Sequence, residues 1–262
     1  MPATRLYCML SGFLHQDQSV IAHGVGMGTE VSIPVLMFLI VHPKGKVLYE
    51  TGLEPAGARV TSYYEFADTR TEVELDHGIV PQLAQLGYAP NDIDYVVLSC
   101  LYFDHAGGLK YFPQSTIIVQ REETDEAWWP TKARKLVVDG AYSMQDLNPA
   151  RNFQFLYPET DEYDIFGDGS VIVLRVPCHA RGEQAVLARL RNSTVLMPGG
   201  ASPQQGHLEL RNIQGRLMVS PDEALRSMEK ISRIAQSENA VVLLHHDPNT
   251  WRSYKLAPEY YD

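Results

Sequence analysis

Short apolar runs separated by polar turns extend through most of the chain, and they predict buried strands. The longest run covers residues 33–41, and a turn at 42–46 joins it to a second run at 47–50, a pattern typical of a hairpin. A polar turn at 191–193 separates two of the later runs. These later runs predict strands at residues 95–98, 115–120, 170–176, 194–197 and 240–244.

Two segments have the spacing of amphipathic helices. Leucine and isoleucine recur every three or four residues from Leu75 to Gly87, and Pro81 indicates that this helix begins later than Leu75. Ser220 is a strong N-cap candidate, because a proline follows it and a glutamate stands three residues further on. The apolar face of this second helix comprises Leu225, Met228, Ile231 and Ala235. Strand hairpins with helices to cover them predict a layered α/β or α+β fold.

Polar residues of one chemical kind follow several of the predicted strands. Asp104 and His105 come after the strand at 95–98, His179 after the strand at 170–176, and His246 after the strand at 240–244. Glu50 ends the strand at 47–50 in the same way. Loops at strand ends are where rigid folds carry their functional groups, so we expect these residues to form one site.

Composition and charge limit the classes of partner. The chain has 262 residues, 45% of them hydrophobic, and its 22 basic and 32 acidic residues give a net charge of −10. A nucleic acid or an anionic membrane would need a basic face, so neither partner is expected. Three scattered cysteines do not form a disulfide framework, and we find no signal peptide or apolar run near the ~20 residues of a membrane span, so we expect a cytoplasmic protein.

The segment from Ser99 to Gly108, Ser-Cys-Leu-Tyr-Phe-Asp-His-Ala-Gly-Gly, resembles the metal-binding loop of the metallo-β-lactamase superfamily, whose pattern is H-x-H-x-D-H. The branch it most resembles is the N-acyl-homoserine lactonases. The resemblance covers nearly the whole chain, including the segments at 50–52, 87–90, 177–179 and 246–248. It implies an α+β fold, the four-layer αβ/βα sandwich, in a single domain over residues 1–262.

The resemblance also implies two sets of metal ligands. In the family, the first metal is bound by positions that are Cys100, Tyr102 and His179 here, and the second by positions that are Asp104, His105 and His246. The bridging aspartate falls at Gly200. Only the second set is complete, and three nitrogen or oxygen ligands with one open position are the arrangement of a catalytic zinc. We therefore expect one divalent metal, zinc, at the second set, and no second metal.

Several residue roles stay open. Cys100 is either a small buried apolar residue or a thiolate ligand, and Tyr102 either a packing aromatic or a proton donor to a leaving group. Glu50 is the candidate for orienting a ligand histidine, whereas His245 should point away by strand alternation. The candidate catalytic residues are Asp104, Tyr102 and His179, and the candidate metal ligands are Asp104, His105, His246, His179 and Cys100.

The function implied is metal-dependent hydrolysis of a small molecule. A metal-activated water would attack the carbonyl of a lactone, a lactam or a similar ester or amide. The alternative is a non-catalytic or metal-free member of the fold, which uses the remnant site for ligand binding or for acid–base chemistry. The sequence leaves the oligomeric state open, a homodimer included.

Overall fold

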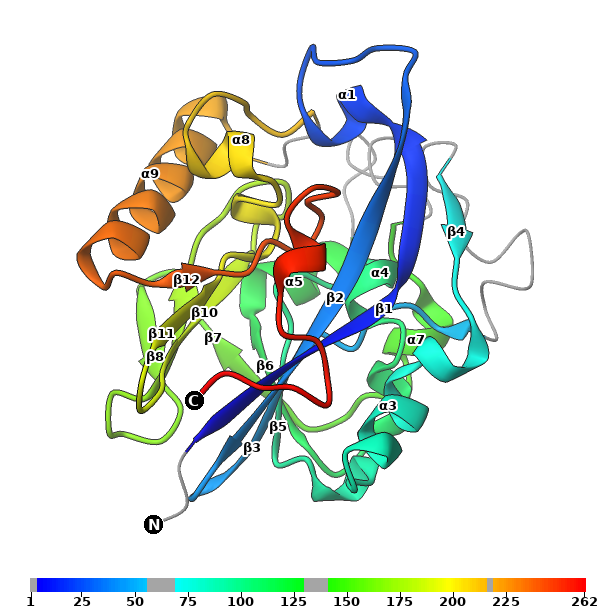
Figure 1. Cartoon of the computed structure of the whole chain (residues 1–262), viewed down its shortest axis with the longest axis vertical. Coiled ribbons are helices and arrows are strands. Elements are labelled where there is room, and N and C mark those ends of the chain that lie inside the picture. Colours follow the sequence, from blue (N-terminus) through cyan, green and yellow to red (C-terminus); the bar gives the residue numbers. More distant parts are fainter. Residues whose placement is uncertain (1–3, 56–68, 130–140, 216–218) are drawn as a thin grey trace.

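Two β-sheets packed face to face form the centre of the molecule, with helices on their outer sides (Figure 1). The computed structural model describes residues 4–55, 69–129, 141–215 and 219–262. The first sheet has the order β4-β1-β2-β3-β5-β6-β7. Its strands are β1 (Arg5–Asp17), β2 (Glu30–His42), β3 (Gly45–Tyr49), β4 (Arg70–Glu72), β5 (Tyr95–Val97), β6 (Thr116–Gln120) and β7 (Phe153–Leu156).

The second sheet has the order β12-β11-β10-β9-β8. Its strands are β8 (Glu162–Asp164), β9 (Val171–Arg175), β10 (Gln184–Arg189), β11 (Thr194–Met197) and β12 (Val241–Val242). Alternate residues of both sheets face each other in the central core, among them Phe38, Tyr49 and Val97 of the first sheet and Val173 and Val186 of the second. This alternation is the period-2 pattern of strands with both faces buried.

Each outer sheet face is covered by helices. Helix α3 (Ile79–Gln85) places Ile79 and Leu83 against the first sheet, while α9 (Pro221–Ser237) places Ala224 and Ile231 against the second. The predicted four-layer αβ/βα sandwich of the α+β class is therefore confirmed. The other helices are α1 (Gln18–Ile21), α4 (Phe103–Ala106), α5 (Arg121–Trp128), α7 (Met144–Leu147) and α8 (Gln205–Leu208), with 3₁₀ turns at Leu75–His77, Pro90–Asp92, Leu109–Tyr111, Gly199–Ala201 and Trp251–Ser253.

Both predicted helices form where their end signals indicate. Ser220 Oγ accepts a hydrogen bond from the backbone N–H of Glu223 at 3.2 Å, which is the N-cap contact of α9. The segment from Leu75 starts as a 3₁₀ turn, and the α-helix begins only at Ile79, two residues before Pro81. Proline is tolerated in a first helical turn because its missing N–H has no partner there.

The predicted strands match the structure, with two corrections. The turn at 191–193 does not connect the strand at 170–176 to the strand at 194–197. Strand β10 lies between these two strands in the sequence and pairs antiparallel with both β9 and β11. The two alanines of β10 weaken the strand signal in its sequence. The strand predicted at 240–244 is only two residues long, since the chain leaves β12 after Val242. Among the described residues, no helix is both long enough and apolar enough to cross a bilayer.

Candidate metal centre

Polar residues from four loops meet where β3, β5, β9 and β12 end. Strands β3 and β5 are parallel neighbours, so their carboxyl ends lie at the same side of the sheet. The loops after these strands carry Glu50 and the pair Asp104–His105, and the loops of the second sheet add His179 and His246. The structure therefore brings together the residues that the strand ends predicted to form one site.

Asp104, His105 and His246 place one oxygen and two nitrogens around a common point. The Nε2 atoms of His105 and His246 lie 3.4 and 3.5 Å from Oδ2 of Asp104 and 3.4 Å from each other. All three side chains are buried. Two imidazole nitrogens and a carboxylate oxygen this close together make a set of ligands for a divalent metal such as zinc.

The other ring nitrogen of each histidine in this trio has its own partner. Nδ1 of His246 donates to the carbonyl of Pro34 at 2.8 Å, and Nδ1 of His105 lies 3.2 Å from Oε2 of Glu50 and 3.2 Å from Oγ of Ser99. Ligand histidines in proteins are almost always oriented in this way, with Nδ1 bonded and Nε2 facing the metal. Glu50 therefore lies where it can orient His105, as its predicted role requires.

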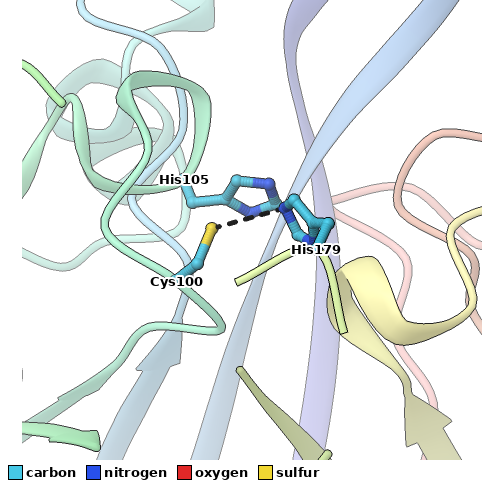
Figure 2. A group of neighbouring side chains, drawn as sticks. All are labelled: Cys100, His105 and His179. Atoms are coloured by element: carbon cyan, nitrogen blue, oxygen red, sulfur yellow. Dashed lines mark hydrogen bonds between the residues drawn. The ribbon is translucent and has the colours of Figure 1, made fainter. Parts of the chain in front are cut away.

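A second trio of potential ligands also includes His105. The side chains of Cys100, His105 and His179 each offer one ligand atom, and these atoms lie within 4.8 Å of one another (Figure 2). Sγ of Cys100 is 3.9 Å from Nε2 of His179. Nδ1 of His179 bonds Oε2 of Glu183 at 2.7 Å, so this histidine is also oriented by a carboxylate.

Tyr102 lies beside this second trio. Its hydroxyl donates to the backbone carbonyl of His179 at 3.3 Å, and its ring packs edge-on against the rings of His179 and Tyr142. Burial, together with the nearby carboxylate of Glu123, raises the pKa of Tyr102 well above its usual value. The raised pKa makes this hydroxyl a weaker proton donor than an ordinary tyrosine, so it could serve as a general acid only if a nearby cation lowered its pKa.

The site holds an excess of buried negative charge. Glu50, Asp104, Glu123 and Glu183 are all buried, and in the described part of the chain no lysine or arginine pairs with any of them. Burial alone would lower the pKa of His105, but the carboxylates of Asp104 and Glu50 outweigh it and raise the pKa to about 10. Among the described residues, these carboxylates have histidines as their only basic partners, and buried carboxylates that lack lysine or arginine partners fit a divalent cation.

The pKa of His246 shifts in the opposite direction to that of His105. Burial lowers the pKa of His246 to about 4, and the neighbouring His105 adds to the effect. Its Nε2 therefore carries a free lone pair at neutral pH, which is the state of a metal ligand.

Gly200 stands where the family has its bridging aspartate, and the structure has no room for a side chain there. A Cβ atom built on Gly200 would overlap the ring of His179 and the carboxylate of Glu183. These two side chains fill the space that a bridging carboxylate would occupy.

Three residues at the site were not predicted from the sequence. Glu123, in the first turn of α5, accepts hydrogen bonds from the backbone N–H groups of Leu101 at 3.0 Å and Gly182 at 3.3 Å, and so joins the two loops that carry the second trio. Glu183 orients His179. His245 is buried, with Nε2 3.8 Å from Oε1 of Glu50, although strand alternation suggested that it would point away.

Only one of these three residues had a signal in the sequence. Glu183 stands where the family pattern has a histidine, and this departure is the signal, whereas Glu123 and His245 depend on how distant segments pack.

A buried Asp-His-His trio at the strand ends of an αβ/βα sandwich defines a metal-hydrolase type of site. The family model described as the metallo-beta-lactamase superfamily matches residues 33–252. The N-acyl homoserine lactonase AttM of Agrobacterium fabrum (strain C58) is 35% identical over 267 residues, which cover all of both chains. The chain therefore belongs to the metallo-beta-lactamase superfamily.

Other relatives and solved structures extend this likeness. The N-acyl homoserine lactonase AiiA of Bacillus thuringiensis subsp. kurstaki is 27% identical, with 99% of this chain and all of the relative covered. An N-acyl homoserine lactone hydrolase, solved with N-hexanoyl-L-homoserine at its catalytic metal centre, has a TM-score of 0.86 and 24% identity over the whole of both chains. The dizinc lactonase AidC has a TM-score of 0.66 and 17% identity, over 98% of this chain and 92% of its own. These two structures share the fold.

Proposed function

We propose that this protein is a metal-dependent hydrolase that opens a lactone or a similar cyclic ester or amide. The observation that carries the proposal is the Asp104–His105–His246 trio, in which both histidines have Nδ1 bonded and Nε2 directed at one carboxylate oxygen. Full-length similarity to N-acyl homoserine lactonases supports the reaction class. A lactone with an acyl-homoserine group is thus the first substrate to test, beside simpler lactones.

In this proposal the trio binds one divalent cation, zinc. When bound, the cation would polarise the substrate carbonyl and lower the pKa of a water molecule. Gly200 supports a single metal, because it has no side chain to replace the family's bridging aspartate, and His179 and Glu183 occupy the space beside it.

The chain's own residues would perform the proton transfers. Oδ2 of Asp104 is 3.4 Å from Nε2 of His105, so this carboxylate lies at the metal site. It can accept a proton from the attacking water. His179 can relay that proton, because Glu183 stabilises its charged form. The Tyr102 hydroxyl lies beside His179 and is the group we assign to protonate the leaving oxygen or nitrogen, with the bound cation lowering its pKa.

The experiment measures metal content and turnover on the same protein, purified without chelator or histidine tag. We expect about one zinc per chain and hydrolysis of at least one member of a lactone panel, both lost in His246→Ala. Tyr102→Phe is the matched control, since it should keep the metal and lose turnover. A metal-loaded protein that hydrolyses no lactone, lactam or ester would favour the alternative of a binding protein, and a metal-free chain with turnover would favour metal-free acid–base chemistry.

A further inference from the structure

Cys100 is placed as a metal ligand would be. Its side chain is fully buried in the loop between β5 and α4, and its Sγ is 3.9 Å from Nε2 of His179. Figure 2 shows the sulfur and the two imidazole rings of His105 and His179 facing one another. A thiolate and two imidazoles are a ligand set that soft or borderline cations prefer, because sulfur is a soft donor.

Each histidine of this set has a polar partner at Nδ1 that orients its ring. Glu183 bonds Nδ1 of His179 at 2.7 Å, and Glu50 and Ser99 lie 3.2 Å from Nδ1 of His105. In both rings, Nε2 is therefore the nitrogen left to bind a cation. A cysteine that served only as a small apolar residue would not need a neighbouring histidine oriented in this way.

The sulfur trio and the Asp104–His105–His246 trio share His105. One imidazole nitrogen coordinates one cation, so the two trios are alternative positions and not two sites filled together. Asp104 gives the first trio a hard oxygen donor, and Cys100 gives the second a soft sulfur donor. The choice between them therefore depends on the cation.

We propose that Cys100, His105 and His179 form a second position for the catalytic cation, which thiophilic cations such as cadmium occupy with Cys100 as a thiolate ligand. This inference rests on the proposed function, because it assumes the metal site at His105. Oxygen-preferring cations such as manganese stay with Asp104, His105 and His246. When the cation binds, the Cys100 thiol loses its proton to solvent and the new bond is sulfur to metal, so no oxidant or reductant is needed.

The test is a titration of the metal-free full-length chain with cadmium or manganese. Cadmium should bind at about one per chain and produce a thiolate-to-cadmium charge-transfer absorption in the ultraviolet. Cys100→Ala should abolish the band and weaken cadmium binding by at least roughly 10–100-fold, since loss of a ligand costs no less than loss of the group that orients one. Manganese affinity should not change in this variant.

Two control variants separate this proposal from the others. Cys178→Ala removes another buried thiol from the loop that carries His179, and it should keep the cadmium band. His246→Ala should keep the band as well, while it loses manganese and lactone turnover.

Three outcomes would overturn the proposal. The unsubstituted protein binds no cadmium, it binds cadmium without the absorption band, or the band persists in Cys100→Ala. The unsubstituted protein alone decides the first two outcomes, so a variant that fails to fold does not remove the test. A cadmium band in a protein without lactone turnover would refute the proposed function and leave this inference standing.

Discussion

Oε2 of Glu50 lies 3.2 Å from Nδ1 of His105, while Oε1 of the same carboxylate accepts the backbone N–H of Ser99 at 3.0 Å. One side chain thereby joins the end of β3 to the loop that carries the metal ligands. Glu50 adopts a left-handed backbone conformation, with φ of 69°, which is uncommon for a residue with a side chain. This conformation positions the carboxylate between two donors of the neighbouring loop.

Glu50→Gln should therefore weaken metal binding without removing a ligand. A glutamine offers one oxygen acceptor where the carboxylate offers two, so either Ser99 N–H or His105 Nδ1–H loses its contact with this side chain. We expect the affinity for zinc to fall about 10–100-fold, measured by competition with a chromophoric chelator. Glu54→Gln is the control, because this buried glutamate pairs with Lys110 outside the site. Equal losses in the two variants would show that the effect is general destabilisation.

Substitutions in the Asp104–His105–His246 trio and at Tyr102 should have different effects on zinc occupancy. His246→Ala or Asp104→Asn should remove most of the metal, because each takes one of three ligands from the oxygen-containing trio. Tyr102→Phe should leave zinc in place, since the Tyr102 hydroxyl contacts the backbone of His179. Metal analysis after gel filtration measures the outcome. The assignment is wrong if Tyr102→Phe empties the protein while His246→Ala stays loaded.

Gly200→Ala should displace His179. The added Cβ overlaps the imidazole ring, so the ring must leave its contact with Glu183, and overpacking of this kind costs about 1–3 kcal/mol of unfolding free energy. In a His179→Ala background the same change should cost less, because the ring is gone. Urea denaturation of the single and double variants forms the cycle. Additivity within about 0.5 kcal/mol would mean that the two residues do not interact.

Protonation of His207, which lies away from the metal site, should destabilise the folded protein in mild acid. Nε2 of this histidine donates to the carbonyl of Ile21 at 3.0 Å, Nδ1 is buried and has no hydrogen-bond partner within the described residues, and burial lowers the pKa of His207 to about 4. An unfolded histidine binds a proton near pH 6.5, so between about pH 6.5 and 4 the unfolded chain holds the extra proton. The free energy of unfolding should be fully retained above this window and fall by up to about 3 kcal/mol within it.

The matched variants are His207→Gln, which retains an N–H donor, and the exposed His23→Gln. Denaturation across this pH range should show a flatter profile for His207→Gln and an unchanged profile for His23→Gln. A His207→Gln profile parallel to that of the unsubstituted protein would contradict the assignment.

The sequence predicts this site well where local pattern and topology coincide. Asp104, His105 and His246 each follow a strand end, and the parallel pairing of β3 with β5 is enough to expect that Glu50 meets His105. Glu123 is different, because it reaches the site from the first turn of α5, and only the packing of that helix brings it to Leu101 and Gly182. No sequence pattern encodes such a contact.

The same distinction explains the strands. The run at 33–41 is identifiable because β-branched and large apolar residues fill it, and the structure extends it to Glu30–His42. Strand β10 is also largely buried, but Ala185 and Ala188 point to its two opposite faces, and residues this small produce only a weak strand signal. Burial without side-chain bulk is visible only in three dimensions.

The wide separation of the ligands along the chain has a consequence for when the cation is acquired. His105 follows a strand of the first sheet, whereas its partners His179 and His246 follow strands of the second sheet, and His246 comes 141 residues after His105 in the sequence. A growing chain on the ribosome folds from its N-terminal end and cannot complete the Asp104–His105–His246 trio until the strands of the second sheet have been made. A cation that needs all three ligands would therefore be acquired late in folding, after the first sheet has formed.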